Sequence, residues 1–336
     1  MSSRDLDFAR VDAFTAVAFQ GNPAGVVTRG ADALSEDQMR IIAREMNVSE
    51  TAFLLPPSKP GADLRIRWFT PAREVNLCGH ATIASFHVAA EEGSWGLAGE
   101  GTRRLRVETR AGILPVEVEL RPDAPAVVRM GLPEPEVTEW TDTAAVRLAL
   151  GIAPDAAAGE PPAIQCGDYV LLPVAHLREL RDLKPDASAL RRIPLPGGAD
   201  GVLVVTTHTT EPLSAVHVRM FAPAAGLPED PGTGSAQGPV AAWLARSGYF
   251  DGDAGRREGI HRGGDDEPTR PIRRFHRGPG GRIGYTAEQG DFLGRRCRIE
   301  VELDLHAGAG AGAPRARNVS IQGSAVTVLT GRIRTP

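Results

Sequence analysis

Short runs of apolar residues, some of them alternating with polar ones, recur along the chain and predict β-strands. The clearest alternation lies at 64–69, where Leu64, Ile66 and Trp68 are apolar and the residues between them are arginines. Such a strand presents one face to a core and the other to solvent. Further strands are expected at 8–14, 24–27, 51–55, 105–109, 113–120, 169–174, 202–206, 216–221, 297–303 and 326–329.

Two stretches have the spacing of helices instead. Ser35 followed by Gln38 matches a capping box, and the apolar residues of 39–46 then fall on one face of a helix. The stretch 79–93 is apolar on almost every side, which predicts a helix buried in the interior.

The segment around the strand at 64–69 occurs twice. Residues 65–72 (RIRWFTPA) and 217–224 (HVRMFAPA) share the frame x-x-Arg-x-Phe-x-Pro-Ala at an offset of 152 residues. Each copy is followed by a glycine-bearing turn and then by an apolar helix. A repeat of this length is too long for a solenoid. It predicts two similar domains that face each other across a cleft.

Length and composition agree with two globular domains. The chain has 336 residues, of which 42% are hydrophobic and 24% charged. The expected N-terminal domain spans 1–130, with the strand at 325–336 returning to it, and the C-terminal domain spans 131–324. The 38 glycines and 27 prolines favour many turns, and flexible insertions are expected at 251–281 and 306–314.

Charge and cysteine usage narrow the class of protein. The net charge of −4 argues against a nucleic-acid-binding surface. The chain has neither a run of about 18 apolar residues nor a signal-peptide core near its start, so no membrane partner is expected. Its three cysteines, Cys78, Cys166 and Cys297, are far apart. They indicate a reducing cytoplasmic location rather than a disulfide framework.

The two glycine turns are candidate anion sites. The first reads Cys-Gly-His at 78–80, and the second reads Asp-Pro-Gly-Thr-Gly-Ser at 230–235. Backbone N–H groups at a helix N-terminus are unsatisfied and carry partial positive charge. Two such turns converging on one cleft would bind a carboxylate and stabilise negative charge that develops on a carbon acid. The alternative is a pair of ordinary tight turns.

Ionisable residues accompany these turns. Glu50 stands between a helix and a strand, where it is either a solvated or capping residue or, beside a histidine and an aspartate, a general base. His80 is the best candidate among the eight histidines. The histidines form no HxxxH pair, so no metal site is expected. The chain also lacks nucleotide-binding glycine motifs and a Gly-x-Ser-x-Gly elbow, so no nucleotide cofactor is indicated.

Several longer segments resemble the PhzF-like isomerases of phenazine biosynthesis, within the diaminopimelate epimerase fold superfamily. The matching segments are DAFTAVAFQGNPAGVV (12–27), MRIIAREMNVSETAFLL (39–55), IRWFTPAREVNLCGHATIASFHV (66–88), RMFAPAAGLPEDPGTGSAQGPVAAWLARSG (219–248), EQGDFLGRRCRIEVEL (288–303) and SAVTVLTGRI (324–333). The region 130–200 fits loosely, and the insertion at 251–281 departs from the family.

The resemblance implies an α+β fold of two pseudo-symmetric domains, each a curled sheet around a central helix, with the active site between them. It also implies a cofactor-independent and metal-free isomerase of secondary metabolism, such as antibiotic biosynthesis. That enzyme would be a homodimer and would shuttle a proton within a small cyclic carboxylic acid, dihydro-hydroxyanthranilate in the family. The residues carried over as catalytic are Glu50, His80, Asp230 and Ser235, and those carried over as substrate-binding are Asn22, Ser49, Cys78, Gly79 and Gly234.

Two other functions stay open at this point. Racemases and epimerases of this fold carry one cysteine in each turn, but Pro231 stands where the mate of Cys78 is expected, which disfavours that reading. A non-catalytic protein that binds small acids is the third possibility. The sequence identifies neither the substrate nor the oligomeric state.

Overall fold

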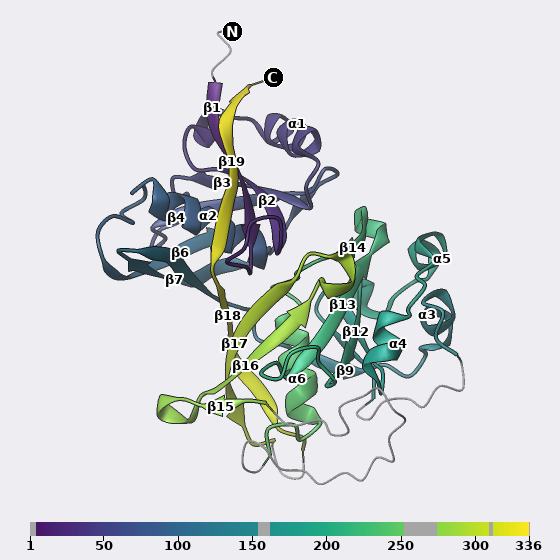
Figure 1. The fold of residues 1–336 in the computed structure, drawn as a ribbon. Helices are drawn as coiled ribbons and strands as arrows, with labels where there is room; N and C mark the ends of the chain where they lie inside the picture. Colours follow the sequence, from purple (N-terminus) through teal and green to yellow (C-terminus); the bar gives the residue numbers. More distant parts are fainter. Residues whose placement is uncertain (1–4, 154–161, 252–273, 309–311, 336) are drawn as a thin grey trace.

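The computed structural model describes residues 5–153, 162–251, 274–308 and 312–335. We call the strands β1–β8 together with β19 the N-terminal half, and β9–β18 the C-terminal half (Figure 1). The strands are β1 (Asp5–Ala13), β2 (Asn22–Val27), β3 (Glu50–Leu55), β4 (Leu64–Phe69), β5 (Glu74–Val75), β6 (Gly101–Thr109), β7 (Gly112–Arg121), β8 (Ala124–Gly131), β9 (Val137–Glu139), β10 (Ile164–Cys166), β11 (Tyr169–Pro173), β12 (Gly201–Thr206), β13 (Val216–Ala222), β14 (Leu227–Asp230), β15 (His276–Arg277), β16 (Ile283–Gln289), β17 (Cys297–His306), β18 (Arg315–Gly323) and β19 (Ala325–Arg334). The helices are α1 (Glu36–Met46), α2 (Gly79–Glu91), α3 (Ala144–Ala149), α4 (Leu177–Arg181), α5 (Ala187–Arg192) and α6 (Gln237–Arg246).

The two halves repeat one strand arrangement. In the N-terminal half the strands pair in the order β19-β1-β2-β3-β4-β6-β7-β8. In the C-terminal half the order is β9-β10-β11-β12-β13-β16-β17-β18. Both series run antiparallel, antiparallel, parallel, antiparallel, parallel, antiparallel, antiparallel. The internal repeat inferred from the sequence is thus a repeat of structure, with β4 equivalent to β13 and α2 to α6.

The two halves exchange their outermost strands. The strand that follows the N-terminal half in the chain joins the sheet of the C-terminal half, and the strand that follows the C-terminal half joins the sheet of the N-terminal half. β9 follows β8 in the chain and pairs with β10. β19 follows β18 in the chain and pairs with β1 (Figure 1). β8 and β18 also pair with each other, which makes the hydrogen-bonded sheet continuous. The predicted domain boundaries stay a prediction, because hydrogen bonds cross between the halves at this point.

The equivalent helices α2 and α6 form the centre of each half. From Gly79 to Ala89 every residue of α2 is buried, as is every residue of α6 before Arg246. Both helices lack a polar face, which is the pattern of a helix enclosed by its sheet. One hydrophobic cluster includes residues of both helices and of strands from both halves. The α+β architecture with a curled sheet around a central helix is as predicted.

The local predictions from the sequence hold where the pattern is strong. Ser35 caps α1, and Gln38 completes the capping box. The sequence pattern did not predict strands β8, β16 and β18, the short strands β5, β9, β10, β14 and β15, or the short helices α3, α4 and α5. β16 (IGYTAEQ) contains glycine and polar residues and yet is buried almost throughout, so its pattern resembles neither an exposed nor a core strand.

Parts of the predicted insertions lie outside the described residues, namely 252–273 and 309–311. The described end of the first insertion forms β15 and a turn of 3₁₀ helix at Pro279–Gly281. Within the described ranges, none of the helices combines the length and the apolar character needed to cross a membrane.

Candidate active site

The two glycine turns touch each other through their backbones. A Cβ atom on Gly79 would lie 2.8 Å from the Cα of Gly234, and one on Gly234 would lie 3.0 Å from the Cα of Gly79. Neither position has room for a side chain, because backbone atoms cannot move aside. The glycines therefore bring the start of α2 and the turn before α6 together, as the repeat predicted.

Glu50 is the first residue of β3 and is buried beside the first turn. Its Oε2 atom lies 3.4 Å from Nε2 of His80. Burial is the largest influence on this carboxyl group, and the nearby charge of Asp230 adds to it; together they raise the pKa of Glu50 to about 8. Hydrogen bonds from Ser49 and Cys78 oppose the rise. Such a carboxyl group can gain and lose a proton near neutral pH.

His80 lies at the first turn of α2 among several polar side chains. Its Nε2 atom is 3.2 Å from Oγ of Ser49, and its Nδ1 atom is 3.5 Å from Sγ of Cys78. Burial lowers the pKa of His80, while the charge of Asp230 acts in the opposite sense. Burial also raises the pKa of the Cys78 thiol well above its usual range. The histidine is thereby held neutral and the cysteine protonated.

Asp230 comes from the C-terminal half and is fixed by partners from both halves. Asn22 donates from Nδ2 to Oδ1 of Asp230 at 2.9 Å and also to the carbonyl of Gly232 at 2.8 Å. Thr233 donates from its hydroxyl to the other carboxylate oxygen. Gln289 donates to the backbone carbonyl of Asp230 at 2.7 Å and accepts from the N–H of Thr233 at 3.0 Å. The carboxylate is therefore held in one orientation.

Ser235 makes a contact that the sequence did not reveal. Its Oγ atom lies 2.6 Å from the hydroxyl of Tyr169, the first residue of β11. Glu50, Asp230, Ser235 and Tyr169 all line one cavity of about 350 Å³, together with residues of both glycine turns. This volume suits a small organic acid.

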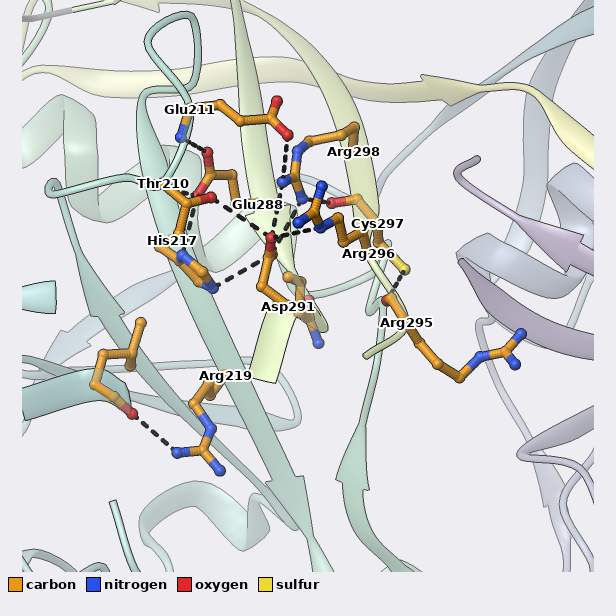
Figure 2. Close-up of polar contacts among 12 residues, drawn as sticks. Thr210, Glu211, His217, Arg219, Glu288, Asp291, Arg295, Arg296, Cys297 and Arg298 are labelled. Carbon is orange, nitrogen blue, oxygen red and sulfur yellow. Dashed lines mark hydrogen bonds and ion pairs between the residues drawn. The ribbon is translucent and has the colours of Figure 1, made fainter. Parts of the chain in front are cut away.

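Beyond Gln289, a buried charged cluster supports the second turn (Figure 2). Glu288 precedes Gln289 on β16, so the two side chains point to opposite faces of the strand. Nδ1 of His217 lies 3.0 Å from Oε2 of Glu288, and Nε2 lies 3.6 Å from Oδ2 of Asp291. Arg298 pairs with Asp291 at 2.8 Å.

The electrostatics of this cluster favour a fixed structural network. Burial by itself would raise the pKa of Glu288, but the hydrogen bond to His217 and those from the amides of Thr210 and Glu211 lower it to about 2. The ring of Phe292 stacks on His217 with centroids 4.9 Å apart. The cluster thus holds the strand from which Gln289 reaches the Asp230 turn.

Two groups of described residues have side chains of the types that bind metals, Glu50-Cys78-His80 and His217-Glu288-Asp291. In the first group the raised pKa of Cys78 opposes formation of a thiolate ligand. In the second, the guanidinium of Arg298 already neutralises Asp291. Neither group is therefore well suited to bind a divalent cation, and we assign no metal to either of them.

The structure brings together all the residues predicted for the site. Seven of them line the cavity, and the other two, Asn22 and Ser49, are bonded to its members Asp230 and His80. The roles assigned to them stay predictions. The predicted mate of Cys78 was wrong: because Gly79 meets Gly234, the residue equivalent to Cys78 is Thr233, not Pro231. Sequence reasoning missed Tyr169 and Gln289, whose partners lie 66 and 56 to 59 residues away.

Known proteins are similar to this chain in sequence. An uncharacterized isomerase of Escherichia coli (strain K12) is 37% identical over 248 residues, which cover 72% of this chain and 80% of the relative. An uncharacterized isomerase of Clostridium acetobutylicum is 36% identical over 247 residues, with the same coverage. Isomerase is also the class that we expected from the motifs.

Solved structures share the fold. A PhzF-family phenazine biosynthesis protein of Bacillus anthracis superposes with a TM-score of 0.76 at 25% identity, covering 98% of this chain and 99% of that one. A hydroxyproline epimerase of Agrobacterium vitis gives a TM-score of 0.57 at 16% identity, covering 98% and 93%, which is a likeness of fold alone.

The sequence profile of the phenazine biosynthesis-like proteins, PhzC-PhzF, matches residues 11–264. This range contains both glycine turns and every residue predicted for the site. Together with the identities above, the match confirms the resemblance found in the motifs. The chain belongs to the family of phenazine biosynthesis-like proteins.

Proposed function

We propose that this protein is a cofactor-independent isomerase that moves a proton between two carbons of a small, unsaturated carboxylic acid. One observation carries the proposal: Glu50 is a buried carboxyl group with a pKa of about 8, inside a cavity that both halves line. A group with this pKa is deprotonated often enough to accept a proton and is acidic enough to return it.

The geometry suggests how the chain would carry out the transfer. The carboxylate of Glu50 takes a proton from a carbon of the substrate, so that a C–H bond breaks and an O–H bond forms. The electron pair left behind spreads toward the substrate carboxylate as an enolate. Amide N–H groups of the two turns, at Gly79 and at Gly234 and Ser235, would stabilise this charge. Glu50 then returns the proton to a second carbon, and the substrate leaves as an isomer of the same composition.

Neighbouring residues tune this base. His80, held neutral by burial, lies 3.4 Å from the Glu50 carboxylate and can orient it. The charge of Asp230 raises the pKa of Glu50 and so strengthens it as a base. The substrate class most consistent with the family is a cyclic dienoic acid such as dihydro-hydroxyanthranilate. The protein would work in the cytoplasm and as a homodimer.

The test is isotope exchange in D₂O. Wild-type protein is incubated with dihydro-hydroxyanthranilate and with a panel of small cyclic unsaturated acids, and mass spectrometry follows deuterium in each acid. At least one acid should exchange and isomerise. Glu50→Gln should lower that rate by about 10² to 10⁴-fold, the usual contribution of a positioned base. Undiminished turnover by Glu50→Gln would refute the proposal.

An amino-acid epimerase is the second candidate, because the fold is shared with a hydroxyproline epimerase. In that reaction Cys78 would be a base, and Cys78→Ala would abolish exchange at Cα of a cyclic amino acid. The raised pKa of Cys78 and the threonine at its equivalent position in the second turn argue against this candidate. The D₂O panel separates the two, since it reports which carbon exchanges.

A further inference from the structure

The equivalence of the two halves shows what replaces Glu50 in the C-terminal half. On β3, Glu50 precedes Thr51, which pairs with Phe69 of the first repeat. On β12, Gly201 precedes Val202, which pairs with Phe221 of the second repeat. Gly201 is therefore the counterpart of Glu50. The second half has no carboxyl group at the position where the first half has its candidate base.

The space that this glycine leaves is filled by Tyr169. Gly201 and Tyr169 are direct neighbours on the parallel strands β12 and β11. A Cβ atom on Gly201 would lie 2.6 Å from Cδ1 and 2.9 Å from Cε1 of the Tyr169 ring. The ring can take its position only because residue 201 has no side chain. From there its hydroxyl reaches Oγ of Ser235 at 2.6 Å.

The hydroxyl of Tyr169 stays protonated. Desolvation raises the pKa of Tyr169, and the charges of Asp230, Asp168 and Glu50 act in the same sense, against the hydrogen bond to Ser235. A neutral tyrosine has one O–H to donate, and a serine can accept it and still donate its own. If Tyr169 is the donor of this pair, the serine O–H is available for a further acceptor in the cavity, such as an oxygen atom of a bound substrate.

We propose that Tyr169 is a positioning residue that makes Ser235 a hydrogen-bond donor to the substrate oxygen on which negative charge develops. This inference rests on the proposed function. It divides the chemistry between the halves: Glu50 of the N-terminal half handles the proton, and the Tyr169–Ser235 pair of the C-terminal half stabilises the oxyanion. It also requires a substrate that presents a carboxylate or enolate oxygen to Ser235.

Three variants test the pairing, measured with the acid of the D₂O panel that wild type exchanges fastest. Tyr169→Phe removes only the hydroxyl and should lower kcat about ten- to hundredfold with little change in KM, less than loss of a direct oxyanion donor. Ser235→Ala should lower kcat at least as much. The double variant should be no slower than Ser235→Ala, because the tyrosine acts only through the serine.

A fourth variant and a control address the alternatives. Gly201→Ala should reproduce the loss of kcat by displacing the Tyr169 ring, while every candidate catalytic side chain is kept. Tyr285→Phe is the control, since Tyr285 is buried in the core and its hydroxyl lacks a hydrogen-bond partner among the described residues; it should leave kcat unchanged. Thermal unfolding of each variant identifies any loss that follows from poor folding.

The outcomes separate this inference from the function on which it rests. If Glu50→Gln abolishes exchange but Tyr169→Phe keeps full kcat, or if the losses of Tyr169→Phe and Ser235→Ala multiply in the double variant, the inference is wrong and the function stands. If no acid in the panel exchanges, or if Glu50→Gln exchanges at the wild-type rate, the proposed function fails and the inference falls with it.

Discussion

The two halves of the molecule share their supporting interactions and differ where they line the cavity. In the N-terminal half, Arg67 forms a two-point ion pair with Glu74 and lies over the ring of Phe69. In the C-terminal half, Arg219 pairs with Glu229 and lies over Phe221 in the same way. These are the arginine and phenylalanine of the repeated sequence frame. Each arginine ties its strand to the glutamate of the segment that follows, so each repeat holds its own turn.

A second interaction is shared by the two halves, and it lies at the other end of β4 and β13. Glu108 of β6 accepts hydrogen bonds from the amides of Ser58 and Lys59. Glu288 of β16 accepts them from Thr210 and Glu211. In each half one carboxylate thus binds the loop between the two central antiparallel strands.

The two halves differ in the side chain that lies beside this carboxylate. Arg65 lies 3.7 Å from Glu108 and is partly exposed, whereas His217 lies 3.0 Å from Glu288 and is fully buried. At the turns the contrast is larger still, because Cys78 and His80 in one half are matched by Thr233 and Ser235 in the other. The comparison teaches that the supporting contacts of the two halves are symmetric, whereas the side chains at the cavity are not.

The largest effect is expected from breaking the contact between the halves. Gly79→Ala would place a methyl group 2.8 Å from the backbone of Gly234, which must move away. We expect a loss of about 1 to 3 kcal/mol in the free energy of unfolding and a fall of about 10² in kcat, because the two turns separate. Gly238→Ala is the control, since its new methyl group would be 3.8 Å from Leu132. Equal unfolding curves and equal kcat for the two variants would show that the close contact is dispensable.

The next prediction concerns the charge that the C-terminal half lends to the N-terminal base. Because the Asp230 carboxylate raises the pKa of Glu50, Asp230→Asn should lower it. Only the carboxylate form of Glu50 accepts a proton, so kcat/KM of the wild type should rise as the pH passes the Glu50 pKa of about 8. In the variant this rise of kcat/KM should occur at lower pH. Asp168→Asn, which removes a different charge from the cavity wall, should leave the pH at which kcat/KM rises unchanged. If the rise of kcat/KM in Asp230→Asn occurs at the same or at a higher pH, the Asp230 charge does not raise the pKa of Glu50.

The two loop-binding glutamates should differ in their contributions to stability. Glu288→Gln is expected to cost about 3 kcal/mol, because it removes a buried carboxylate whose pKa is lowered to about 2 by the hydrogen bonds that it accepts, whereas Glu108→Gln should cost about 1 kcal/mol. Urea unfolding of both variants measures the difference. The pKa of Glu288 lies near 2, below its usual 4.5, so its contribution is complete above that usual value and is lost as pH falls toward 2. Equal costs for the two variants at pH 7 would show that the Glu288 carboxylate contributes no more to stability than the Glu108 carboxylate does.

The smallest effect is expected at the rim of the cavity. Arg73 of the N-terminal half pairs with Asp200 of the C-terminal half, and the arginine is more than half exposed. Arg73→Ala should change the free energy of unfolding by less than about 1 kcal/mol, as for most exposed ion pairs. A double-mutant cycle with Asp200→Ala gives the coupling energy. A coupling energy well above that range would contradict the expectation that this exposed ion pair adds little to the contact between the halves.

The sequence predicted those parts of the fold and site whose signal is local. The frame around Arg67 and Arg219 identified the repeat because the same contacts need the same residue types in both halves. The sequence predicted Tyr169 only as the first residue of a strand. Its proposed role depends on Gly201 and Ser235, which lie near it only in the folded chain. β16 was missed for a similar reason: its polar Glu288 and Gln289 are buried against partners from distant segments.

The exchange of outer strands between the halves has a consequence for synthesis of the chain on the ribosome. β1 is made first, but its partner β19 is made more than 300 residues later. At about 5 to 20 residues per second, the nascent chain waits many seconds for that partner. One edge of β1 must meanwhile be covered by other contacts or by a chaperone, since an open strand edge invites pairing with other chains. The C-terminal half receives β9 before its remaining strands are made, so it can close its sheet before the N-terminal half does.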